Sequence, residues 1–129
     1  MANRVVVLNV PFAALAAFLL ALAVGLGAFG AHALKERLDA YALGIWEKAV
    51  FYHFVHALGM LIVASVAKMR ESTAEIVCWF LLAGIVLFSG SLYLLALTGT
   101  KALGAVTPFG GVAFILAWAV LGWSLFRNS

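Results

Sequence analysis

The sequence predicts an all-α protein, an integral membrane four-helix bundle. Apolar residues make up 67% of the 129-residue chain and charged residues 10%, against roughly half and a quarter in ordinary soluble domains. A soluble fold of this length would still expose much of its surface, and too few polar side chains are present to cover it. The chain also contains four long uncharged stretches, and about 20 apolar residues suffice for a helix to cross a bilayer.

Four transmembrane helices are expected over about residues 10–32, 45–67, 73–97 and 107–126, because an ionised side chain at mid-bilayer is costly. No linker, charge run or low-complexity tract divides them, so we expect a single four-span domain over residues 1–129. An apolar stretch after Arg4 also resembles a cleavable signal peptide. It is far longer than the roughly 7–15 residues of a signal-peptide core, which favours a retained helix.

Local signals mark the starts of the first and third helices. Asn9 before Pro11 is typical of a cap followed by a proline in the first turn. Ser72 and Glu75 have the spacing of a capping box, in which each side chain accepts a hydrogen bond from a free backbone N–H group. We therefore expect helices to begin at these two places.

The last helix has two alternative starts. Gly99 predicts the end of the preceding helix, and Thr107 before Pro108 predicts a new cap with a first-turn proline. The alternative is a longer helix that begins near Leu103 and is kinked at the proline.

The segment between the first two spans has a different pattern. Leu34, Leu38, Tyr41 and Ile45 recur at helical spacing, while the charged residues of this segment fall mostly between them. This pattern predicts a short interfacial helix that lies on the headgroups. A charged loop is the alternative, and the sequence leaves both open.

The positive-inside rule gives nearly equal support to the two possible orientations in the membrane. Four spans place both termini and the second loop on one side of the membrane. That side carries Arg4, Lys68, Arg70 and Arg127, and the other side carries Lys35, Arg37, Lys48 and Lys101. We expect cytoplasmic termini.

The basic residues form no stripe of the kind that follows a phosphate backbone, so nucleic acid is not an expected partner. Cys78 is the only cysteine, which excludes an internal disulfide and predicts a packing role.

Small residues predict how the helices associate, because helices in lipid are held by close packing and hydrogen bonds. Contact within the bundle is the favoured interpretation of these small residues, with a homodimer face as the alternative. The first and last helices carry them at Ala13, Ala17, Ala21, Gly25, Gly27, Gly110 and Gly111.

Polar side chains form a second pattern. The chain order of the spans places the three histidines, together with several hydroxyl-bearing residues, in the leaflet nearer the first and third loops. We expect a polar cluster there, made of His32, Tyr52, His53, His56, Ser89, Ser91, Tyr93 and Thr107.

Three interpretations of this cluster compete. Neutral histidines that hydrogen-bond across helices are favoured, each bond contributing about 1 kcal/mol or less. A hydrated pocket for a ligand or protons is second, because ionisable groups within a membrane are candidates for function. Metal or haem ligation is the least favoured, so we expect no cofactor and no metal. No paired carboxylates and no Cys–His arrangement indicate catalysis, so we expect no enzyme.

Several motifs taken together resemble those of a known family. They lie at residues 27–34, 46–53, 56–59, 87–93 and 107–111. With these motifs the sequence is similar to the YgdD-like bacterial inner-membrane family, known as domain of unknown function 423, and to transmembrane protein 256. The resemblance implies a multi-pass protein of the bacterial inner (plasma) membrane and supplies no catalytic residues.

Two functional hypotheses follow. The leading one is a non-enzymatic accessory or assembly subunit of a larger membrane complex, whose partners are the lipid bilayer and other membrane subunits or a second copy of itself. The alternative is a small transporter, or a ligand- or proton-binding bundle, that uses a pocket lined by the histidines in one leaflet. In that case the histidines should titrate near neutral pH.

Overall fold

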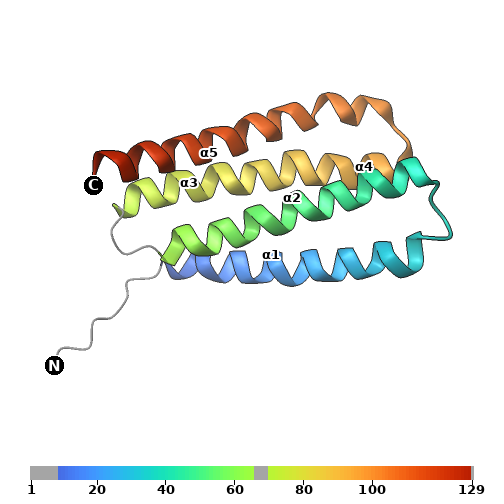
Figure 1. Ribbon diagram of the computed structural model, residues 1–129, viewed down its shortest axis with the longest axis horizontal. Coiled ribbons are helices and arrows are strands. Elements are labelled where there is room, and N and C mark those ends of the chain that lie inside the picture. The colour runs from blue at the N-terminus through green and yellow to red at the C-terminus, as the bar shows by residue number, and fades with distance from the viewer. Residues whose placement is uncertain (1–8, 66–69, 129) are drawn as a thin grey trace.

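The protein is a bundle of four long helical segments that run side by side (Figure 1). The computed structural model describes residues 9–65 and 70–128, and within these ranges it contains helices and turns but no strand. The segments are Val10–Leu34, Ala40–Ser65, Glu71–Thr98 and Lys101–Arg127, each long and apolar enough to cross a membrane. The predicted all-α membrane bundle is therefore confirmed.

The first span consists of α1, Val10–Phe29, and a π-helical turn η1, Gly30–Leu34. The side chain of Asn9 accepts a hydrogen bond from the backbone N–H of Phe12, with 3.4 Å between the two atoms. A proline occupies the first turn of α1, where its missing N–H removes no helical hydrogen bond. The predicted cap is thus confirmed.

The second span, α2, covers Ala40–Ser65 and begins earlier than expected. The carboxylate of Asp39 accepts a hydrogen bond of 2.7 Å from the backbone N–H of Ala42, as an N-cap does. This cap starts the transmembrane helix itself, and residues 35–39 contain no helix, so the structure shows the loop of the two alternatives that the sequence left open. The predicted end at residue 67 lies outside the described residues, as do Arg4 and Lys68.

The third span consists of α3, Glu71–Gly84, a π-helical turn η2, Ile85–Ser89, and α4, Gly90–Thr98. The predicted capping box was wrong: Arg70 is the N-cap residue and no side chain caps this end. Because α3 already starts at Glu71, Ser72 lies inside the first turn. Gly99 adopts a left-handed conformation, with a φ of 70°, and ends α4 as predicted.

The fourth span consists of a 3-10 turn η3, Lys101–Ala105, and α5, Thr107–Arg127. Thr107 is the first residue of α5 rather than its cap, so that prediction was wrong. Its hydroxyl bonds to Ser91 and to the carbonyl of Leu103 instead. A proline does occupy the first turn of α5, as predicted. The sequence left open whether the helix starts at Thr107 or near Leu103. In the structure α5 starts at Thr107, and a 3-10 turn covers the residues around Leu103.

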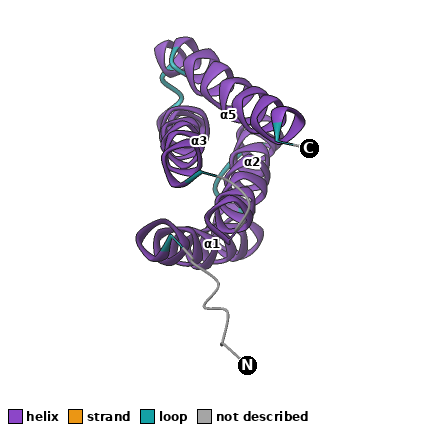
Figure 2. Cartoon of the chain, turned by 90° about the vertical axis from the view of Figure 1, so that its left-hand side faces the viewer, coloured by secondary structure: helices purple, strands orange, loops and turns teal. Residues whose placement is uncertain are grey.

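The helices form an open stack in which α2 is the central element (Figure 2). It packs against α1 on one side and against α3, η2 and α4 on the other, whereas α5 packs mainly against α3 and η2. The core lies among α2, α3 and α5. Its most deeply buried apolar side chains are Met60, Val63, Val77, Cys78 and Leu81.

Candidate functional site

His53 is buried at the contact between α2 and α4. Its ring is only 2% exposed, and its Nδ1 atom lies 2.8 Å from the hydroxyl of Tyr93. Trp46 adds a second aromatic contact to Tyr93, with 4.7 Å between ring centroids. The Nε2 atom of His53 has no hydrogen-bond partner among the described residues. A polar atom buried in this way costs about 1–3 kcal/mol.

His56 lies one turn further along α2 and is packed between aromatic rings. Its imidazole stacks on Phe114, with 3.5 Å between centroids and 12° between planes. Its Nδ1 atom is 2.7 Å from the backbone carbonyl of Tyr52, four residues earlier. Because a carbonyl only accepts hydrogen bonds, Nδ1 carries the hydrogen. The Tyr52 ring in turn packs on Phe88, 4.3 Å between centroids.

Hydroxyl groups join the third span to its neighbours. Ser89, the last residue of η2, donates a 2.8 Å hydrogen bond to the carbonyl of Ala49 in α2. Ser91 and Thr107 lie 2.6 Å apart through their hydroxyl oxygens, which joins α4 to the start of α5. Each contact satisfies a polar group that lipid could not satisfy.

His32 lies apart from the other predicted site residues. It is exposed on η1 and makes no hydrogen bond with the described residues. His53 and His56 lie at the middle of α2 and beyond it, because this helix begins at Ala40 rather than near residue 45. The predicted cluster is thus a series of separate contacts spread along the bundle, and its position in one leaflet stays a prediction.

The described residues contain no group of three or more His, Cys, Asp or Glu side chains close enough to hold a metal ion. The buried parts of the series are also tightly packed, since His53, His56, Ser89 and Ser91 are each less than 7% exposed. In chemical terms, the arrangement joins helices by hydrogen bonds and ring stacking.

The small residues of α1 form two faces. Ala17, Ala21 and Gly25, which we expected to pack within the bundle, are exposed, and a side chain at Gly25 would meet nothing within 4 Å. Their predicted contact inside the bundle was therefore wrong. Ala13 is half-buried against the core. The exposed row lies on the opposite side of α1 from α2, because α2 occupies the other face.

The face of α1 toward α2 carries Ala16, Ala23, Gly27 and Gly30. Both alanines are 0% exposed, and a Cβ atom at Gly27 would lie 3.4 Å from the Val50 side chain. At Gly30 a Cβ atom would collide with the ring of Trp46. The sequence analysis missed Ala16 and Gly30, although their seven-residue spacing through Ala23 could have indicated them.

The glycines of α5 behave differently from each other. A Cβ atom at Gly110 would collide with the backbone nitrogen of Phe88, so the predicted close packing there is borne out. At Gly111 it would make only an ordinary contact of 3.8 Å with the Phe88 ring.

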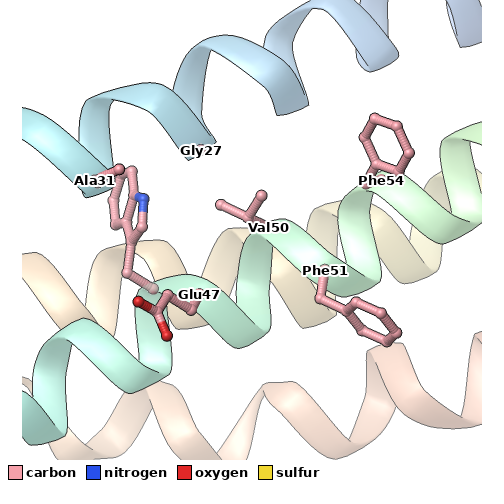
Figure 3. Close-up of a pocket in the computed structure, with 8 residues that line it drawn as sticks. Gly27, Ala31, Glu47, Val50, Phe51 and Phe54 are labelled. Atoms are coloured by element: carbon pink, nitrogen blue, oxygen red, sulfur yellow. The ribbon is translucent and has the colours of Figure 1, made fainter.

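A groove between α1 and α2 was also missed. It has a volume of about 410 Å³ and an apolar wall apart from Glu47, which lies at one end (Figure 3). Val50 and Phe54 point from α2 toward α1, where Gly27 and Ala31 form the opposite wall. The sequence analysis had no signal for it, because the groove depends on how two helices dock. Its lining residues are Gly27, Gly30, Ala31, Trp46, Glu47, Val50, Phe51 and Phe54.

Four apolar helices joined by dry polar contacts define an integral membrane protein. Residues 26–111 match a family described as protein of unknown function DUF423. The chain belongs to this family, which confirms the resemblance found in the sequence.

Relatives of the chain are named as membrane proteins. The chain is 49% identical over 100 residues to a UPF0382 membrane protein of Staphylococcus saprophyticus, covering 78% of this chain and 83% of the relative. It is 49% identical over 102 residues to UPF0382 membrane protein YwdK of Bacillus subtilis, with coverage of 78% and 83%. A Staphylococcus haemolyticus relative is 43% identical over 116 residues, with coverage of 90% and 95%. No solved structure matches the chain.

Proposed function

We propose that this protein is a non-enzymatic accessory or assembly subunit of a larger complex in the bacterial inner membrane. The observation that carries the proposal is the outer face of α1. Only Ala16 and Ala23 are buried among the 20 residues of this helix. One face of this span packs on α2, and its outer face is available for contact with another protein.

The chemistry of this face supports helix association. Ala17, Ala21 and Gly25 follow each other at four-residue spacing and are all exposed. Because lipid tails are as apolar as leucine, helices associate in a bilayer where small residues let two backbones approach closely. Phe18, 75% exposed beside this row, offers a ring that can fill the space next to a partner helix.

The absence of enzymatic activity is supported by the state of the reactive side chains. Cys78 is fully buried, and His56 is hydrogen-bonded to its own helix. His53 is bonded to a tyrosine hydroxyl. The tyrosine hydroxyl is the one group here that a base contacts, and His53 is only 2% exposed, which leaves no room for a substrate beside it.

The test compares partner recovery between variants of the exposed row and a matched control. Ala21→Leu and Gly25→Leu add bulk to the outer face of α1 without touching the bundle, while Gly122→Leu adds the same bulk to an open position on α5. After cross-linking in the membrane and extraction in mild detergent, the first two variants should lose a partner or second copy that the control retains.

Two results would contradict the proposal. One is that no partner and no oligomer is recovered with the wild-type chain. The other is that the α1 variants recover the same partner in the same yield as Gly122→Leu.

For the orientation we propose cytoplasmic termini. Arg70 and Arg127 are exposed at the end of the bundle where α5 finishes, and positive charge is retained in the cytoplasm. By chain order Arg4 and Lys68 belong to the same side as these two, and Lys35, Arg37, Lys48 and Lys101 belong to the other side, so the count of basic residues is four against four and the experiment decides. A reporter enzyme fused to the C-terminus, active only in the cytoplasm, should be active, and an inactive but stably expressed fusion would reverse the assignment.

A further inference from the structure

The groove between α1 and α2 has the polarity of a membrane lipid. Along α2 its wall runs from Glu47 through Val50 and Phe51 to Phe54, a distance of about 10 Å at the helical rise per residue. Gly27 of α1 and Gly30 and Ala31 of η1 contribute almost no side-chain bulk to the other wall. One end is therefore anionic, and the rest is an apolar channel parallel to the helices (Figure 3).

Glu47 lies at a depth along α2 from which its side chain can reach a lipid headgroup. The 26 residues of this helix extend for about 39 Å, whereas the hydrocarbon core measures about 30 Å. If the helix is centred in the bilayer, Glu47 lies about 7 Å inside the hydrocarbon boundary nearer to Ala40. A flexible carboxylate at that depth reaches the glycerol and headgroup region, while Phe54 lies near the middle of the bilayer.

Glu47 has no partner of its own. It is exposed, and it makes no ion pair and no hydrogen bond with the described residues. Lys48 follows it in the sequence but points about 100° away around the helix. Carboxylates within membranes are usually paired because an isolated charge is costly there, so the groove presents an unmatched negative charge.

We propose that this groove binds a phospholipid with a primary ammonium headgroup, of the phosphatidylethanolamine type. The ammonium donates a hydrogen bond to the Glu47 carboxylate, and one acyl chain lies against Val50, Phe51 and Phe54. Charge complementarity selects this occupant, because an anionic headgroup is repelled and a trimethylammonium headgroup has no hydrogen to donate. The proposal does not depend on the proposed function, since Ala17, Ala21 and Gly25 lie on a different face of α1.

The test is native mass spectrometry of the purified full-length chain with phosphatidylethanolamine and phosphatidylcholine of identical acyl chains. The wild-type chain should retain the first lipid about tenfold more strongly, the ratio expected for one charge-assisted hydrogen bond. Glu47→Gln keeps the shape of an exposed side chain and should reduce this ratio to about one. Glu71→Gln removes a carboxylate from the other end of the bundle and should leave the ratio unchanged.

A second variant tests the apolar part of the groove. Gly27→Leu places a side chain into the channel and should weaken retention of both lipids, whereas Gly122→Leu on α5 should not. Equal retention of the two lipids by the wild-type chain would overturn the proposal, because unspecific lipid around any membrane protein would give the same result. A preference that survives Glu47→Gln would overturn it as well, and so would a second protein chain found in place of the lipid.

Discussion

The contact between His53 and Tyr93 shows what a polar side chain does in a dry bundle. The imidazole uses one nitrogen to bond a hydroxyl 2.8 Å away and leaves the other without a partner. This hydrogen bond links α2 to α4 across 40 residues of sequence. Hydrogen bonds between transmembrane helices contribute about 0.6 kcal/mol on average and up to about 1.7 kcal/mol. The unpaired nitrogen offsets part of that gain.

We therefore expect Tyr93→Phe to lower the free energy of unfolding by about 1 kcal/mol. The substitution removes the hydroxyl and leaves both ring nitrogens of His53 without partners. Reversible unfolding in mixed micelles measures the change. Tyr41→Phe is the matched control, because Tyr41 is 77% exposed and should show no loss.

A double-mutant cycle with His53→Phe identifies the interaction. Once the imidazole is gone, removing the Tyr93 hydroxyl should cost less than it does in the wild-type chain. Additive effects of the two substitutions would show that the hydroxyl acts through some other contact.

At the scale of single residues, helical spacing predicted part of what the structure shows. Tyr52, His53 and His56 share one face of α2 as the spacing requires, and Asn9 caps α1. The partners of the histidines could not be predicted in the same way. His56 bonds to its own helix, whereas His53 bonds to Tyr93 on another, and only the docked positions of the helices decide between these choices.

At the scale of the helices, one glycine sets how closely α5 approaches the third span. A Cβ atom at Gly110 would collide with the backbone nitrogen of Phe88 in η2. The obstacle is main chain, so it cannot rotate away as a side chain can. Close approach of this kind is what allows van der Waals contact to hold helices together in lipid.

Gly110→Ala should therefore push α5 away from η2 and destabilise the bundle by about 1–3 kcal/mol, the usual cost of overpacking. The Ser91–Thr107 hydrogen bond, which joins α5 to α4 directly after η2, should be strained with it. Gly122→Ala is the control, because its added methyl group would meet nothing within 4 Å. Thermal unfolding in detergent should separate the two variants, and equal stability would contradict the close approach.

The helix boundaries show which capping signals in the sequence determine where a helix begins. Asp39 starts α2 five residues earlier than we expected, since a single well-placed carboxylate outweighs the spacing pattern of the segment. The capping box at Ser72 failed for a related reason, because α3 had already begun at Glu71. The π-helical turns had no sequence signal at all, since they depend on contacts with neighbouring helices.

At the scale of the whole molecule, the core lies toward one side of the stack. Cys78 is at its centre, fully buried among α2, α3 and α5, and it is the only cysteine in the chain. By contrast, α1 contributes mostly half-buried side chains to this core. The composition predicted the membrane and the number of spans, but not this asymmetry, which results from how the helices dock.

Cys78 should therefore report on the unfolding of the whole bundle. In the folded protein a membrane-permeant maleimide should not label it, and the labelling rate should rise only under conditions that unfold α2, α3 and α5. An Asn128→Cys, Cys78→Ala variant, labelled in parallel, controls for reagent access, because Asn128 is exposed. Rapid labelling of Cys78 in the folded wild-type chain would contradict the packing described.

The π-helical turn of the third span has one further consequence. Such a turn accommodates one residue more than the regular helix would, so the side chains after it are rotated by about 100° relative to an uninterrupted helix. Leu81 lies before the turn and Ser91 after it, so a single wheel drawn through all 28 residues of the span would misplace one relative to the other by that rotation. A helical wheel for this span therefore has to be drawn in two parts, the second starting at Gly90. An insertion or deletion within residues 85–89 would rotate Tyr93 away from His53, although the hydropathy of the span would hardly change.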